Sequence, residues 1–266
     1  MLLDIVSFSC PLILGSIGAL FSEFTGSFAL FLDGLISFSA FLTYYFSVVT
    51  HSLIAGTILS MLACTVTTGA FCLLIEKLKA NRFVAAIAMN LLFSALVSFM
   101  SYICFGTRGI LASPQFSPDN FTVKIITVVI TLITVILAIF FIKYTNWGLY
   151  IRITGSDSDV LIAKGVNPLY TRITAWSLAA LSGSLAGSFL VLKLSSFVPN
   201  ISSGRGWMAL AAVFLGRKKI WRITLCVIIF CATDYFGVNI QNYLPGIPSP
   251  LLLSLPYLTA LLLILL

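Results

Sequence analysis

Long runs of apolar residues dominate the sequence, and short polar segments separate them. A helix that crosses a hydrocarbon core of about 30 Å needs roughly 20 such residues. By this measure the sequence predicts eight membrane-spanning helices, at 5–21, 28–50, 53–75, 84–105, 121–143, 173–193, 222–238 and 250–266. A membrane β-barrel would instead alternate polar and apolar residues at every second position. The pattern indicates an all-α polytopic integral membrane protein, a single transmembrane domain over residues 1–266.

One further apolar run, 206–216, is too short to cross the bilayer alone. The segment before it, 195–205, is rich in Ser, Pro, Asn and Gly, which favour irregular backbone. Irregular backbone at membrane depth survives only where it is buried in protein or lines an aqueous cavity. We therefore expect a short broken or re-entrant helix here, a feature typical of a translocation path.

The longest polar segment, 144–172, contains signals for a short helix outside the bilayer. Ser156 or Asp157 is suited to cap its N-terminus, where acidic residues also favour the helix dipole. Gly165 is suited to end it. The sequence predicts a helix at about 157–164, and a plain connecting loop is the alternative.

Composition and charge exclude several classes of protein. Hydrophobic residues make up 60% and charged residues 9% of the chain, against roughly 25% charged in a soluble domain. This excludes a soluble enzyme and, despite the net charge of +7, a nucleic-acid binder. Eleven of the fifteen basic residues lie in 76–82, 143–172 and 217–222. The positive-inside rule places these segments in the cytoplasm, the N-terminus outside and the C-terminus inside.

Few residues could carry chemistry. The chain has one histidine, and its six cysteines lie in apolar stretches, so we expect neither a metal site nor a disulfide framework. There is no G-x-x-x-x-G-K-[ST] phosphate loop, so this chain does not itself supply ATP-derived energy for transport. We expect no catalytic residues and no cofactor.

Four polar residues fall within or beside apolar runs. They are Glu23, Asp33, Asn90 and Asp234. A charge in hydrocarbon costs at least about 2.5–3.5 kcal/mol, so each should face protein or water. We expect Glu23 to be a solvated or capping residue at a helix end, and Asp234 to be solvated at a helix end. Asp33 lies inside an apolar run, and it either lines a path or bonds to a neighbouring broken helix.

Together these features predict a substrate path. We expect Asp33 and Asn90 to converge with the turn at 204–208, which contributes Arg205 and Trp207. Each is polar or irregular where lipid would penalise it.

Three stretches, 11–34, 148–167 and 204–217, resemble those of a known family, in family order. The third is the most specific: it reads GRGWMALAAVFLGR, similar to the family's GRGFIALAAVIFGR. The family comprises the permease subunits of ATP-binding-cassette importers of the branched-chain amino acid and simple-sugar class. The branch most similar to this chain pairs with basic-membrane-protein-type lipoproteins and imports nucleosides.

The resemblance implies a set of partners in a bacterial cytoplasmic membrane. These are cytoplasmic ATPase subunits, a second permease that is a paralogue, and an external substrate-binding lipoprotein. The helix at 157–164 would be the coupling helix that docks into an ATPase groove and buries the apolar Val160, Leu161 and Ile162. The expected coupling residues are Gly155, Asp157, Asp159, Val160, Leu161 and Gly165.

Departures from the family pattern bear on the cargo. Phe24, Ala29 and Phe31 stand where the family has Arg, Asn and Gly, and Asp33 replaces Glu. A nucleoside is the first expectation. Aromatic residues near the path would also accept a flat ring system, so a riboflavin-type cargo comes second and a simple sugar third. The alternative function is a self-sufficient channel or an ion-coupled transporter, which would need ion ligands or a proton relay within the membrane.

Overall fold

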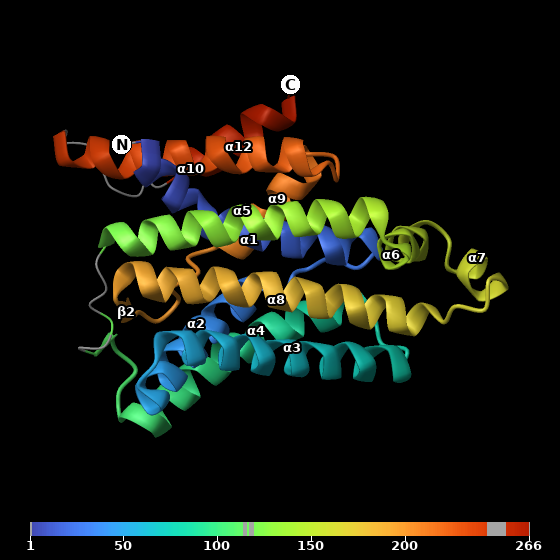
Figure 1. Cartoon of the computed structure of the whole chain (residues 1–266), viewed down its shortest axis with the longest axis horizontal. Coiled ribbons are helices and arrows are strands. Elements are labelled where there is room, and N and C mark those ends of the chain that lie inside the picture. The colour runs from blue at the N-terminus through green and yellow to red at the C-terminus, as the bar shows by residue number, and fades with distance from the viewer. Residues whose placement is uncertain (1, 114–115, 117–119, 244–253, 266) are drawn as a thin grey trace.

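The computed structural model describes residues 2–113, 116, 120–243 and 254–265. Long helices run side by side along one axis of the molecule, and two short ones project at one end (Figure 1). The helices are α1 (Leu2–Phe24), α2 (Leu32–Thr50), α3 (Leu53–Lys77), α4 (Arg82–Phe105), α5 (Asn120–Tyr144), α6 (Asn146–Ser156), α7 (Ser158–Ala163), α8 (Pro168–Leu194), α9 (Arg205–Leu215), α10 (Ile220–Tyr243) and α12 (Leu255–Leu265).

Within the described residues, seven helices are long and apolar enough to span a membrane: α1–α5, α8 and α10. They confirm the all-α polytopic class and lie at predicted spans. The eighth predicted span, 250–266, begins outside the described residues, and its described part is the eleven-residue α12. The short helix expected near 206–216 is α9.

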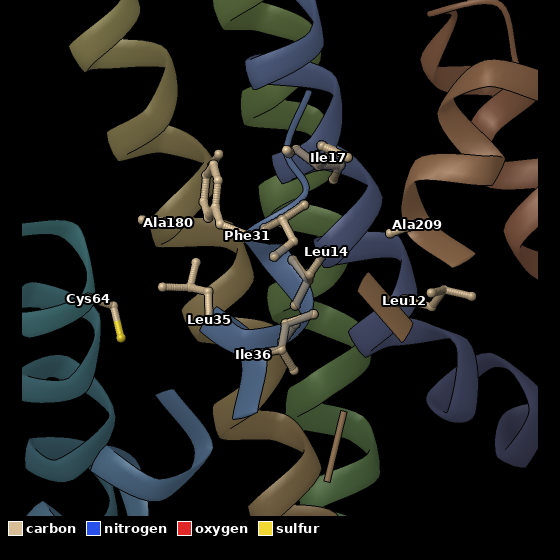
Figure 2. Close-up of a cluster of buried hydrophobic side chains, with 14 of the residues drawn as sticks. Leu12, Leu14, Ile17, Phe31, Leu35, Ile36, Cys64, Ala180 and Ala209 are labelled. Atoms are coloured by element: carbon tan, nitrogen blue, oxygen red, sulfur yellow. The ribbon is translucent and has the colours of Figure 1, made fainter. Parts of the chain in front are cut away.

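Helix α8 lies at the centre and packs against α1, α2 and α3. Its buried face is rich in Gly, Ala and Ser, which let neighbouring backbones approach closely. A Cβ atom on Gly187 would overlap the carbonyl oxygen of Ile36 on α2. Figure 2 shows the apolar core beside this contact, where Leu14 and Ile17 of α1 lie near Phe31 and Leu35.

The structure corrects one predicted boundary. Helix α2 begins at Leu32 and not at 28, because 25–31 forms a non-helical link. Much of that link is apolar, so counting hydrophobic residues merges it with the helix. Two short strands, β1 (Leu111–Ala112) and β2 (Ser196–Phe197), also form an antiparallel pair in a chain predicted to be all-α.

Ion pairs tie together the end of the bundle from which α6 and α7 project. The Glu76 carboxylate at the end of α3 bridges Arg82 at 2.6 Å and Arg172 at 2.9 Å. Glu23, expected to be solvated or to cap a helix, is instead buried, and its carboxylate lies 3.1 Å from Lys218 Nζ. The lysine reaches it because the α9–α10 turn lies beside the end of α1. These contacts place the three predicted basic segments at one end of the molecule.

Candidate functional site

The site is built around the break between α1 and α2. Gly26 adopts a φ of +74°, which turns the chain out of the helix. The Ser22 hydroxyl donates to the Ser27 carbonyl at 2.7 Å, and the Thr25 hydroxyl donates to the Ser22 carbonyl at 2.7 Å. These bonds satisfy backbone groups inside the break. Phe31 then stacks on Trp176 of α8, with ring centroids 4.7 Å apart, and anchors the start of α2.

The first turn of α2 is held between α9 and α4. Asp33 Oδ1 accepts a hydrogen bond from the Gly206 backbone N–H at 3.0 Å. The next residue, Gly34, donates its backbone N–H to Asn90 Oδ1 at 2.5 Å. The structure therefore brings Asp33, Asn90 and the N-terminus of α9 together, although they are far apart in the sequence.

Two glycines make this junction possible. A Cβ atom on Gly206 would overlap the backbone nitrogen and Cα of Asp33. A Cβ atom on Gly34 would overlap the backbone carbonyl of Asn90. The three helices can approach this closely only because both positions lack a side chain.

Two helix N-termini meet at the junction, and a side chain from another helix caps each: Asp33 accepts from Gly206 of α9, and Asn90 accepts from Gly34 of α2. Phe31 precedes α2, Gly204 precedes α9, and neither supplies a capping hydrogen bond. The first N–H groups of a helix carry partial positive charge and attract electron-rich groups. Half-helix N-termini in this arrangement are typical of substrate sites in transporters.

A polar stripe on α4 continues from the junction. Asn90, Ser94 and Ser98 recur every four residues and so lie on one helix face. Ser94 and Ser98 are exposed, and each hydroxyl donates to the carbonyl four residues earlier, at 3.0 and 3.4 Å. The two serines were missed by the sequence reasoning, although their spacing from Asn90 was a usable signal. Trp207 is also exposed, on the first turn of α9.

Arg205 is directed elsewhere. Its guanidinium lies 5.8 Å from the ring centroid of Phe8 on α1 and donates to the Ile201 and Ser202 carbonyls at 3.3 Å. It lines a cavity of about 440 Å³ with Asp234, which is half-buried there. The structure thus joins Arg205 to α1 and α10, while its neighbour Gly206 makes the junction with Asp33.

The second candidate site is the projecting α6–α7 pair. The predicted short helix is present as α7, and Asp157 caps it by accepting from the Asp159 backbone N–H at 2.9 Å. Gly165 follows with a φ of +75° and ends the helix, as expected. The same Asp157 ends α6, a helix that the sequence did not predict.

Helix α6 rests directly on the end of α1. A Cβ atom on Gly155 would overlap the Phe24 carbonyl oxygen. The hydroxyls of Thr154 and Thr171 lie 2.7 Å apart and tie α6 to α8. The α6–α7 pair is therefore braced against two membrane-spanning helices.

The apolar residues of α7 do not share one exposed face, contrary to expectation. Leu161 is fully buried within this chain, while Val160 is 43% and Ile162 is 61% exposed. Successive helical residues point about 100° apart, so three in a row cannot enter one groove. The surface available to another protein includes Val160, Ile162 and the exposed Asp159.

These features define a class: a helical membrane permease with broken helices at membrane depth and a helical pair that projects from one end. The chain belongs to the family described as the permease component of the branched-chain amino acid transport system, whose model matches residues 1–266. It is thus a permease of the importer type within the ATP-binding-cassette transporters, a family of transport proteins. Permeases of this family work with an ATPase and a substrate-binding protein in a lipid membrane.

Two relatives cover almost the whole chain, and a third matches part of it. A nucleoside ABC transporter permease of Lactococcus lactis is 24% identical over 96% of this chain and 87% of its own length. A guanosine ABC transporter permease of Bacillus subtilis is 24% identical over 96% of this chain and 88% of its own length. A ribose import permease of Escherichia coli is 33% identical over 30% of this chain and 25% of its own length.

A solved structure shares the fold. PsaBC from Streptococcus pneumoniae, in complex with Fab, superposes with a TM-score of 0.57 at 16% identity. The match covers 98% of this chain and 87% of that one.

Proposed function

We propose that this chain forms half of the path by which an ATP-driven importer carries a nucleoside across a bacterial cytoplasmic membrane. The observation that carries the proposal is the junction at the break in the α1–α2 segment, where Asp33 and Asn90 bind the N-termini of two short or broken helices. Substrate sites in transporters lie at such discontinuous helices, where polar groups can meet the hydroxyls and ring carbonyls of a nucleoside. The full-length relatives named for nucleoside and guanosine transport favour this cargo over a riboflavin-type compound or a simple sugar.

The path would follow the α4 stripe. Each of the exposed Ser94 and Ser98 hydroxyls donates to its own helix but keeps acceptor lone pairs, and we propose that they line a water-filled passage beside a second permease. We propose that this second permease is a paralogue. The second candidate, a self-sufficient ion-coupled transporter, would need ion ligands or a proton relay within the membrane.

Thiol blocking tests the path in cells that express the whole system. Cysteine is introduced at Ser94, in a background where the exposed Cys104 is replaced by serine. A bulky thiol reagent should then abolish uptake of labelled guanosine. The matched control is Phe99→Cys on the same helix, which is exposed but faces away from the stripe. Equal inhibition of both variants, or of neither, would contradict the path.

Competition tests the cargo. An excess of unlabelled nucleosides should suppress guanosine uptake, while riboflavin and ribose should not. Suppression by riboflavin alone would show that the cargo is a riboflavin-type compound. It would not contradict the proposed path.

A further inference from the structure

A basic cavity lies between α5, α6 and α10, at the end of the bundle from which α7 projects. Its volume is about 560 Å³. Five basic side chains from three separate segments line it: Lys143, Arg152, Arg217, Lys218 and Lys219. The basic segments 76–82, 143–172 and 217–222 hold eleven basic residues. Nearly half of these eleven line this one cavity.

The charge around the cavity is largely uncompensated. Among the described residues, Glu23 is the only acid paired with any of the five, at 3.1 Å from Lys218. By contrast, Arg82 and Arg172 on the opposite side of this end share the Glu76 carboxylate. Like charges gathered without partners repel one another, and a bound anion would relieve that repulsion.

The backbone of the α9–α10 turn has an unusual geometry at the cavity. Arg217 and Lys218 have φ values of +48° and +59°, a conformation that non-glycine residues adopt rarely. Two backbone hydrogen bonds fix the turn. The Lys218 N–H donates to the Val213 carbonyl at 3.2 Å, and the Lys219 N–H donates to the Gly216 carbonyl at 3.0 Å. Unfavourable backbone of this kind persists where the surrounding structure imposes it and is frequent at functional sites.

Apolar surfaces continue from the cavity along the bundle. Ile139, Ile142 and Trp221 are among the apolar residues that line the cavity. Beyond them, Ile136 and Phe140 of α5 are 64% and 58% exposed, as expected of surfaces that contact lipid chains. Trp221 is 75% exposed, and tryptophan favours the headgroup level of a bilayer.

We infer that this cavity binds the phosphate headgroup of an anionic phospholipid, whose acyl chains lie along the exposed faces of α5 and α10. Basic pockets between membrane-spanning helices on the cytoplasmic side bind such headgroups. The cavity lies on helix flanks that face lipid, whereas the projecting α7 is the surface suited to a cytoplasmic protein. The site is independent of the transported cargo.

Native mass spectrometry of the purified full chain tests the inference. The chain, in neutral detergent, is titrated with phosphatidylglycerol or phosphatidylcholine. The test variant combines Lys143→Gln, Arg217→Gln and Lys219→Gln, all at exposed positions. Each basic residue near an anionic headgroup contributes roughly fivefold in affinity, so the variant should bind phosphatidylglycerol about 100-fold more weakly.

The matched control removes the same charge outside the cavity, through Lys77→Gln, Lys79→Gln and Lys164→Gln, also at exposed positions. It should bind phosphatidylglycerol within about twofold of the unmodified chain, because these residues lie outside the cavity. Melting temperatures in detergent confirm folding, and the single variant Lys219→Glu serves where the triple variant does not fold. Equal weakening in test and control variants would overturn the inference, as would equal binding of both lipids.

Two further arms distinguish other occupants. Excess sn-glycerol 3-phosphate should fail to displace the lipid, and effective displacement would assign the cavity to a soluble phosphate. A test variant that keeps phosphatidylglycerol but loses co-purifying ATPase would assign these residues to a protein contact.

Discussion

Gly34 and Gly206 determine how closely three helices approach Asp33. At each position the space for a Cβ atom is filled by the backbone of a neighbouring helix. The sequence marked Asp33 as unusual, because a carboxylate inside an apolar run must find a partner. It could not identify Gly206 as that partner, because 173 residues separate the two and no local pattern links them.

Replacing Gly206 with alanine should therefore destabilise the fold. Overpacking of this kind costs about 1–3 kcal/mol, so the melting temperature in detergent should fall and uptake should fall with it. Gly15→Ala is the matched control, because its Cβ atom would make only ordinary contacts with Ala209 and Ile36, at 3.5 and 3.6 Å. Equal melting temperatures for both variants would show that the junction tolerates a methyl group.

Asn90 offers a second test at the residue scale. Asn90→Leu removes the acceptor for the Gly34 N–H and leaves a buried donor unsatisfied. Such a loss costs about 1–3 kcal/mol, which denaturant unfolding should detect. Asn90→Asp keeps an acceptor and should retain more of the stability than Asn90→Leu. The opposite order would contradict a structural role for the Asn90 oxygen.

At the scale of elements, a helix could be predicted where its start and end are encoded locally, and it could not where tertiary packing determines it. Helix α7 was predictable because its cap, Asp157, and its stop, Gly165, are encoded locally. Helix α6 was not, because Gly148 and several other weak helix formers lower its propensity. Gly148 is needed for packing: its Cβ atom would overlap the Phe141 carbonyl of α5. Tertiary contacts therefore override local preference in α6.

The exposure of α7 revises how its docking should be tested. Ile162→Asp places a charge on the exposed face and should weaken ATPase co-purification by roughly 10- to 100-fold, the equivalent of 1.5–3 kcal/mol for one buried side chain. Folding should be unaffected, because Ile162 is 61% exposed. Leu161→Asp should instead destabilise the chain itself, since Leu161 is fully buried. Normal ATPase binding by Ile162→Asp would remove α7 from the contact.

At the scale of the whole molecule, the basic residues predict orientation. Cysteines introduced at Lys79, Lys164 and Lys219 should react with thiol reagents only from the cytoplasmic side, and one at Gly109 only from outside. Labelling of Lys164→Cys from outside would invert the topology. The ion pairs of Glu76 and Glu23 gather the basic segments at one end, which supports a shared side of the membrane independently of the charge rule.

The contact between Gly155 and Phe24 has a mechanical consequence. Only seven residues, 25–31, separate the end of α1 from the start of α2. A displacement of the α6–α7 pair would thus be transmitted to Asp33 through one backbone contact and a short stretch of chain. Gly155→Ala would force that contact apart. We therefore expect assays of the assembled importer to show continued ATP hydrolysis but little transport.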